Sequence, residues 1–173
     1  MEKFVPDIYQ KSIYTINYDS LILRGVKCLL FDLDNTLVPI TDKKPDQKIK
    51  DLFAELKEKG FKIIIFSNSS KKRLKPFKEE LNVDCCARAC KPSPHKFVKV
   101  MSIYNFEYSE VAIIGDSIMD DIRGGNRVGI TTILINQIGK KEFPYAWLKR
   151  KKENKIVKKL RKLDLFTKGR YYD

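Results

Sequence analysis

Residues 26–37 read VKCLLFDLDNTL, in which a near-continuous apolar run ends in two aspartates spaced two positions apart. Apolar runs of this length are typical of strands buried on both faces of a parallel sheet. Side chains two residues apart in an extended chain point the same way, so Asp32 and Asp34 can face one site. We therefore expect a strand over 26–31 with a pair of carboxylates at its carboxyl end.

Working outward, further apolar runs predict strands at residues 61–66, 111–115, 131–135 and, more weakly, 83–89. Between them, apolar side chains recur at helical spacing over residues 45–59, 71–81, 94–104 and 118–128. Strands that alternate with helices predict a mainly parallel sheet with helices on both faces. The predicted fold class is α/β, a three-layer Rossmann-like sandwich. Such sheets bind ligands beyond the carboxyl ends of their strands.

The residues after the later strands also suit a phosphate or metal site. Ser67 and Asn68 open a helix, where a hydroxyl and free backbone N–H groups can bind an anion. Lys91 precedes a helix that begins with proline, and its ammonium could hold a phosphate. Carboxylates that could ligate magnesium follow residues 111–115, at Asp116, Asp120 and Asp121. Singly, these groups could be helix caps or surface charges; together they favour a magnesium-dependent phosphate site.

In this order, the four groups resemble the motifs of the haloacid dehalogenase-like phosphatases over residues 25–135. The matching segments are DLDNTL at 32–37, SN at 67–68, lysine at 91 and GDSIMDD at 115–121. The resemblance implies the fold of that superfamily and Mg²⁺-dependent hydrolysis of phosphomonoesters through an aspartyl-phosphate intermediate.

The resemblance also implies a role for each residue. Asp32 would be the nucleophile, and Asp34 would protonate the leaving oxygen and then deprotonate the attacking water. The phosphate would be bound by Ser67, the backbone N–H of Asn68, and Lys91. Mg²⁺ would be held by Asp32, the backbone carbonyl of Asp34, Asp116 and Asp121. Asp120 would either lie in the second layer around the metal or replace Asp121 as the ligand.

Neither usual position for a cap domain has room for one. Only residues 38–44 separate the first motif from the first helix, and residues 92–110 between Lys91 and the next strand hold one helix. We therefore expect an open site, which favours a large substrate or one presented on a surface.

Residues 1–150 are more closely similar to the YqeG family of subfamily IIIA, which is similar to the mitochondrial phosphatidylglycerophosphate phosphatases. The similarity includes FVPDIYQKSIYTI at 4–16 and GGNR at 124–127, and it makes Asn126 and Arg127 candidate substrate-binding residues. The alternative is that these glycines serve the backbone geometry of a helix end. The implied reaction is dephosphorylation of phosphatidylglycerophosphate to phosphatidylglycerol at the membrane.

Most of the net charge of +13 lies near the end of the chain. Residues 140–173 contain 13 Lys or Arg and four Asp or Glu, a charge of +9. We divide the chain into a catalytic domain with an N-terminal extension, 1–139, and a basic amphipathic helix or tail, 140–173. The helix is predicted over 145–163, with an apolar stripe of Ile156, Val157, Leu160 and Leu163 and nearby aromatic residues Phe143, Tyr145 and Trp147. Such a helix suits an anionic membrane surface, or its stripe packs on the domain.

The composition of the sequence indicates where in the cell the protein is expected and which classes of function remain. No apolar run approaches the 18–20 residues or so that a membrane span requires, and Glu2 and Asp7 make a poor signal peptide. We expect a cytoplasmic protein, either soluble or peripheral on the inner face of the membrane. The four cysteines, Cys28, Cys85, Cys86 and Cys90, lack the spacing of a zinc site. The alternative function is a nucleic-acid- or ribosome-associated protein with a phosphatase site for another substrate.

Overall fold

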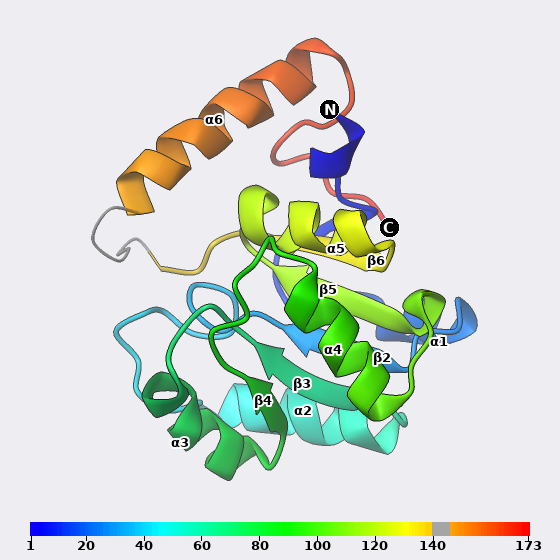
Figure 1. Ribbon diagram of the computed structural model, residues 1–173, viewed down its shortest axis with the longest axis vertical. Coiled ribbons are helices and arrows are strands. Elements are labelled where there is room, and N and C mark those ends of the chain that lie inside the picture. Colours follow the sequence, from blue (N-terminus) through cyan, green and yellow to red (C-terminus); the bar gives the residue numbers. More distant parts are fainter. Residues whose placement is uncertain (140–145) are drawn as a thin grey trace.

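A computed structural model describes residues 1–139 and 146–173 (Figure 1). In the described part of the chain, six parallel strands form one sheet in the order β1-β6-β5-β2-β3-β4. Their bounds are β1 Ile8–Gln10, β2 Cys28–Phe31, β3 Lys62–Phe66, β4 Asp84–Cys86, β5 Val111–Gly115 and β6 Thr131–Ile135. The predicted α/β fold with a mainly parallel sheet is confirmed. Because β2 lies between β5 and β3, the residues that follow it emerge near the middle of the sheet.

The helices occupy most of the predicted ranges. They are α1 Tyr18–Leu23, α2 Gln47–Glu58, α3 Lys71–Leu81, α4 His95–Tyr104, α5 Arg123–Val128 and α6 Ala146–Lys162. The single helix expected over 118–128 is instead a π-helical turn, Ile118–Ile122, followed by α5. Such turns are frequent at functional sites. This one carries Asp120 and Asp121, which the sequence placed in the metal site.

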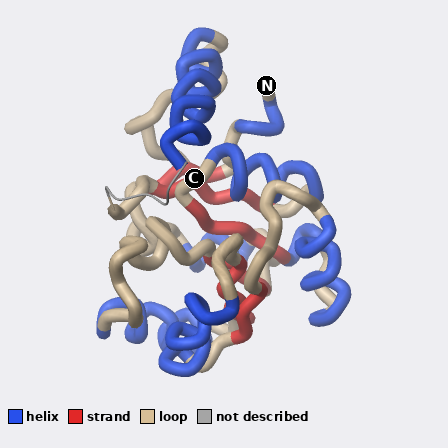
Figure 2. The backbone as a smooth tube through the Cα atoms, turned by 60° about the vertical axis from the view of Figure 1, so that its left-hand side comes forward, coloured by secondary structure: helices blue, strands red, loops and turns tan. Residues whose placement is uncertain are grey.

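Both faces of the sheet are buried, as the apolar runs predict. Leu29 and Phe31 of β2 pack with α1, α2 and α3, whereas Cys28 and Leu30 pack on the opposite face with α4. Figure 2 shows helices on both sides of the strands. Between β2 and α2, and between β4 and β5, the described chain has no inserted cap domain.

The two ends of the chain meet at the β1 edge of the sheet (Figure 1). The sequence analysis did not predict β1, which pairs in parallel with β6, Ile8 lying opposite Ile133. Tyr9 also forms an antiparallel bridge with Tyr172. The final residues therefore cover an edge strand that would otherwise expose unpaired backbone groups.

Three of the four residues of the predicted apolar stripe pack on the domain, whereas Leu163 follows the end of α6 and is 51% exposed. Leu160 is fully buried, and Ile156 and Val157 pack on the same cluster, which includes Ile118 and Leu134. Phe143 and Tyr145, which were predicted to accompany the helix, lie outside the described residues. None of the described helices has the length and apolar composition that crossing a bilayer requires.

Candidate active site

A pocket of about 470 Å³ lies at the carboxyl edge of the sheet, where β2, β3 and β5 end. It brings together eight of the ten predicted site residues: Asp32, Asp34, Ser67, Asn68, Lys91, Asp116, Asp120 and Asp121. These side chains come from four loops that are far apart in sequence. The parallel topology is what makes them neighbours.

The turn after β2 fixes the orientation of Asp32. Asn35 adopts a left-handed conformation with φ of 64°, which asparagine tolerates better than most residues. The chain then folds back, so that the Thr36 hydroxyl donates hydrogen bonds to Asp32 Oδ2 at 3.1 Å and Asp116 Oδ1 at 3.4 Å. Thr36 thus links the first and last motifs.

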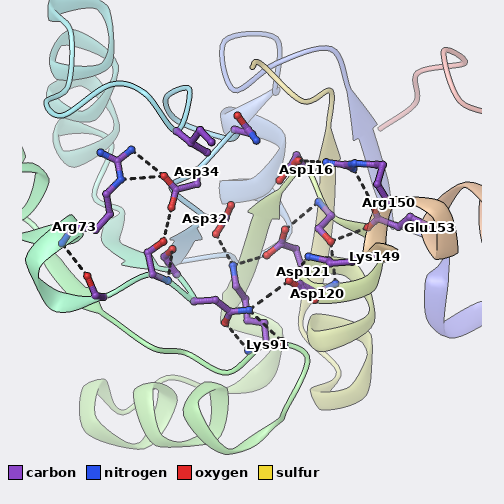
Figure 3. A pocket seen from close by; sticks show the side chains of 17 residues that line it. Asp32, Asp34, Arg73, Lys91, Asp116, Asp120, Asp121, Lys149, Arg150 and Glu153 are labelled. Atoms are coloured by element: carbon purple, nitrogen blue, oxygen red, sulfur yellow. Dashed lines mark hydrogen bonds and ion pairs between the residues drawn. The ribbon is translucent and has the colours of Figure 1, made fainter. Parts of the chain in front are cut away.

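Lys91 is a buried cation between two carboxylates (Figure 3). Its Nζ donates to Asp32 Oδ1 at 2.7 Å, to Asp121 Oδ1 at 2.6 Å and to the Phe66 carbonyl oxygen at 2.9 Å. Burial opposes the charge, but the carboxylates of Asp121 and Asp32 outweigh it and raise the pKa of Lys91. The ammonium therefore remains charged beside Asp32.

Asn68 joins the second and third loops through its side-chain amide. Its Oδ1 accepts from the backbone N–H of Lys91 at 2.7 Å, and its Nδ2 donates to the Lys91 carbonyl oxygen at 3.2 Å. The side chain of Asn68 therefore positions the backbone of Lys91. Ser67 is buried beside these groups and lines the same pocket.

Three carboxylates form a cluster that fits a divalent cation. Asp32, Asp116 and Asp121 each offer an oxygen, and these atoms all lie within 4.8 Å of one another. Burial, together with the charge of Asp32, raises the pKa of Asp116 to about 6. Burial also raises the pKa of Asp121, although Lys91 opposes the shift. Crowded, buried carboxylate oxygens are ligands that Mg²⁺ prefers, so the donor set fits the predicted metal.

The structure distinguishes the two adjacent aspartates of the last motif. Asp121 belongs to the three-carboxylate cluster and is 1% exposed. Asp120 instead forms an ion pair with Lys149 and accepts a hydrogen bond from Asn68 Nδ2 at 3.4 Å. Asp121 thus belongs to the carboxylate cluster that could hold a metal ion, and Asp120 lines the same pocket outside that cluster.

Asp34 has partners of its own on the other side of the pocket (Figure 3). Arg73 Nε and Nη2 donate to Asp34 Oδ1 at 3.1 and 2.9 Å, and the Ser69 hydroxyl donates to Oδ2 at 2.5 Å. The Asp34 carboxylate is not in the three-carboxylate cluster, so the metal role predicted for this residue rests on its backbone carbonyl. Arg73 and Ser69 were not predicted as site residues, because one arginine in a basic helix and one serine beside the SN motif carry no distinctive signal.

The C-terminal helix also lines the pocket, which the sequence analysis did not anticipate. Lys149, Arg150 and Glu153 of α6 all face it. Arg150 Nη2 lies 3.3 Å from Asp116 Oδ2, and its Nη1 lies 2.8 Å from Glu153 Oε2. One signal was present in the sequence: Glu153 is the sole acidic residue between positions 149 and 163.

Asn126 and Arg127, the candidate substrate-binding residues, lie outside this pocket. Asn126 Nδ2 donates to the Val5 carbonyl oxygen at 2.8 Å, and its Oδ1 accepts from Thr132 Oγ1 at 3.1 Å. Arg127 is exposed and donates to the Pro92 carbonyl oxygen at 3.2 Å. Their neighbour Gly125 is needed for close packing, because a Cβ there would lie 2.5 Å from Thr132 Cγ2. In this structure the GGNR segment joins α5 to the sheet and to the N-terminal segment.

Comparison with known proteins agrees with this geometry. The family model of the haloacid dehalogenase-like hydrolases matches residues 39–129. The chain is 32% identical over 159 residues to a Bacillus subtilis protein named probable phosphatase YqeG, covering 92% of each chain. It is 26% identical to the chloroplastic/mitochondrial phosphatidylglycerophosphate phosphatase 1 of Arabidopsis thaliana, covering 93% of this chain and 46% of that one.

Solved structures show the same fold. One is a 3-deoxy-D-manno-octulosonate 8-phosphate phosphatase from Moraxella catarrhalis, determined in complex with a magnesium ion, a phosphate ion and a KDO molecule. It superposes with a TM-score of 0.52 at 17% identity, covering 69% of this chain and 75% of that one.

Proposed function

The chain belongs to the haloacid dehalogenase-like hydrolases and is a phosphoric monoester hydrolase, and from this premise we propose that it dephosphorylates phosphatidylglycerophosphate at a membrane surface. The observation that carries the catalytic part is the meeting of Asp32 with Lys91 and two further carboxylates at the floor of one pocket. The lipid substrate is supported by the similarity of 93% of the chain to a phosphatidylglycerophosphate phosphatase.

In the proposed reaction, Asp32 is the nucleophile. Its carboxylate oxygen attacks phosphorus, the bond from phosphorus to the glycerol oxygen breaks, and Asp34 gives its proton to that oxygen. Asp34 then takes a proton from water, the water oxygen attacks the aspartyl-phosphate, and inorganic phosphate leaves as Asp32 is restored. Arg73 and Ser69 orient Asp34 for both proton transfers.

Positive charge near Asp32 makes this reaction of two anions feasible. Lys91 Nζ is already 2.7 Å from Asp32 Oδ1, so a phosphoryl group bound to Asp32 lies beside the ammonium. Ser67 and the backbone N–H of Asn68 would bind the remaining oxygens. Asp32, Asp116 and Asp121 would hold Mg²⁺, with the Asp34 carbonyl as a further predicted ligand. The metal would offset the repulsion between carboxylate and phosphate.

The outer face of α6 supports attachment to an anionic bilayer. Lys151, Lys155 and Lys158 are exposed there and line a shallow groove together with Trp147, which is 61% exposed; Arg150 and Asn154 also line it. Each lysine near an anionic surface contributes about 1 kcal/mol of binding, and tryptophan favours the interface between water and lipid. The same helix borders the catalytic pocket, so a lipid headgroup would be presented close to Asp32.

A phosphate-release assay with Mg²⁺ tests this function. The panel should contain vesicle-borne phosphatidylglycerophosphate, sugar phosphates, nucleotides and phosphopeptides. We expect the lipid to have the highest kcat/KM, and Asp32→Asn, which is nearly isosteric, to lose about 10³-fold or more of the activity while folding normally. Wild-type rates in Asp32→Asn would refute the mechanism. Preference for another phosphate ester would refute only the lipid assignment.

A further inference from the structure

Two cations of α6 that line the pocket take no part in the proposed reaction. Lys149 and Arg150 line the catalytic pocket on the side opposite Arg73, with Asp32 and Lys91 between (Figure 3). The other two basic residues of the pocket are already engaged by the catalytic carboxylates, Lys91 by Asp32 and Asp121, and Arg73 by Asp34. Lys149 and Arg150 are also paired with carboxylates, Lys149 with Asp120 and Arg150 with Asp116 and Glu153, but they lie in a separate part of the pocket.

Glu153 fixes α6 against this part of the site. It is 4% exposed, and its Oε1 accepts from the Ser117 hydroxyl at 2.7 Å and from the backbone N–H of Met119 at 2.9 Å. Its Oε2 pairs with Arg150. A buried carboxylate with several donors is satisfied in one geometry only, so it holds Lys149 and Arg150 at the pocket wall.

Arg150 lies close to the carboxylate cluster that contains the proposed nucleophile. Arg150 pairs with Asp116, and Asp116 lies in the same carboxylate cluster as Asp32. Arg150 is thus one carboxylate away from the nucleophile. Lys149 pairs with Asp120, and an ammonium has three N–H donors, more than that carboxylate alone requires. Cations held in place by carboxylates bind an anion with little loss of side-chain entropy.

We propose that Lys149 and Arg150 form a second anion subsite, which binds a phosphate group adjacent to the phosphate that is hydrolysed. The inference deepens the proposed function and rests on it, because the phosphatidylglycerophosphate headgroup carries a phosphodiester and a phosphomonoester on one glycerol. The ligand that the subsite would recognise is a phosphomonoester on a glycerol whose three carbons separate it from a second phosphate. Its source is either the lipid or a free headgroup.

Comparing a substrate with one phosphate and a substrate with two phosphates distinguishes binding of the second phosphate from the hydrolysis step itself. The one-phosphate substrate is p-nitrophenyl phosphate. The two-phosphate substrate is the deacylated headgroup, glycerophosphoglycerophosphate, which is soluble and needs no membrane. The variants are Lys149→Gln and Arg150→Gln, singly and together, in the full chain with saturating Mg²⁺. The matched control is Lys152→Gln with Lys159→Gln, which removes the same charge from exposed positions of α6.

We expect each single variant to raise KM for the headgroup about tenfold, the scale of a lost hydrogen bond to a charged group. In Lys149→Gln, which keeps the Arg150–Asp116 pair, the kcat/KM for p-nitrophenyl phosphate should fall much less than the kcat/KM for the headgroup, and the control pair should change neither value. Equal losses on both substrates, or no loss on either, overturn the subsite. Lys149→Gln keeps the Arg150–Glu153 pair, so it remains informative if Arg150→Gln does not fold.

The same variants distinguish the source of the second phosphate. If the lipid is the substrate, the KM increase should recur with vesicle-borne phosphatidylglycerophosphate. An increase confined to the soluble headgroup supports the subsite and refutes the lipid assignment. A wild-type protein that hydrolyses p-nitrophenyl phosphate but shows no preference for the headgroup overturns the subsite alone. Inactivity of the wild type on all three substrates overturns the proposed function itself.

Discussion

Asp32 and Asp34 are two positions apart, yet the structure gives them different surroundings. Asp32 contacts Lys91 and Thr36 and belongs to the carboxylate cluster. Asp34 contacts Arg73 and Ser69. Two carboxylates in unlike environments can take unlike roles, one as nucleophile and one as proton carrier. The Asp-x-Asp spacing therefore aims both side chains at one pocket, and the partners separate their functions.

Substitution of Asp34 should affect substrates according to their leaving groups. Asp34→Asn cannot donate a proton to the departing oxygen, so esters of a glycerol alkoxide should lose far more activity than p-nitrophenyl phosphate, whose phenolate leaves readily. We expect the difference in kcat/KM loss to be about 10²-fold, the scale of general acid catalysis. Asp32→Asn, the control, should lose activity on both. A uniform loss in Asp34→Asn would argue against the acid role.

Substitution of Lys91 should reduce stability as well as catalysis. Lys91→Ala leaves Asp32 and Asp121 buried without the cation between them, and breaking a buried ion pair costs about 3–5 kcal/mol. We expect a lower thermal midpoint, and a larger rise on adding Mg²⁺ than in wild type, because the metal replaces some of the missing charge. Thermal denaturation with and without Mg²⁺ measures both effects. Lys99→Ala, at an exposed position of α4, is the control. An unchanged midpoint would show that the pair contributes little.

At the scale of elements, four strands and helices α2, α3 and α4 were predictable because their residues carry periodic local signals, whereas the short helix α1 was not predicted. The apolar runs of β2, β3, β5 and β6 are nearly continuous. β1 is three residues long and was missed, since it is recognisable only by its pairing with β6. The acidic turn after β5 was predicted as part of a regular helix. Ser117 caps the π-helical turn, and its hydroxyl donates to Glu153 of α6, a contact that no local sequence pattern indicates.

The site residues that follow the strands were likewise predictable, whereas the α6 residues that line the pocket were not. Asp32, Lys91 and Asp121 each lie in a motif that follows a strand, and the parallel sheet brings the ends of these strands to one pocket. Arg150 and Glu153 reach the pocket through the packing of a helix that follows the last strand. A basic amphipathic pattern indicates a helix with one apolar face but does not specify the surface on which that face packs.

Substitution of Glu153 tests whether α6 positions the loop that carries Asp116 and Asp121. Glu153→Ala leaves the Ser117 hydroxyl and the Met119 N–H without their carboxylate acceptor, which costs about 1–3 kcal/mol for each buried group left unsatisfied. The loop that carries Asp116 and Asp121 should become less ordered. We therefore expect a lower thermal midpoint and weaker Mg²⁺ affinity, measured by titrating Mg²⁺ against the midpoint. Glu153→Gln keeps an acceptor oxygen and should be affected less. Equal Mg²⁺ affinity in all three proteins would show that α6 does not position the loop.

At the scale of the whole molecule, α6 has two faces with different environments. One face carries Glu153 and Leu160, which are buried, and borders the catalytic pocket through Lys149 and Arg150. The other carries Lys151, Lys155 and Lys158 with Trp147, which are exposed. The excess charge of the tail is therefore divided between the pocket and the outer surface. An experiment on membrane binding must alter the outer set alone, because changes at Lys149 or Arg150 would also alter the proposed second anion subsite.

Reversal of the outer charges, Lys151→Glu with Lys155→Glu and Lys158→Glu, should release the protein from anionic vesicles. Three lysines supply about 3 kcal/mol of attraction at low ionic strength, and reversal turns it into repulsion. Hydrolysis of vesicle-borne phosphatidylglycerophosphate should slow, whereas hydrolysis of p-nitrophenyl phosphate should not, since that substrate needs only the pocket. Vesicle flotation and the two rates measure this.

The matched control reverses Lys71, Lys72 and Lys75, which are exposed on α3, away from α6 (Figure 1). This variant should stay bound to the vesicles, because the same change in net charge then falls on a different surface. If both triple variants detach from the vesicles equally, attraction of the protein to the vesicles depends on its total charge, and α6 does not form a specific contact with the bilayer. If neither detaches and the wild-type protein instead shifts RNA in a gel, the outer lysines serve a nucleic-acid partner. A three-lysine face beside an open phosphatase pocket is consistent with either polyanion, and detachment confined to the α6 variant would identify the bilayer.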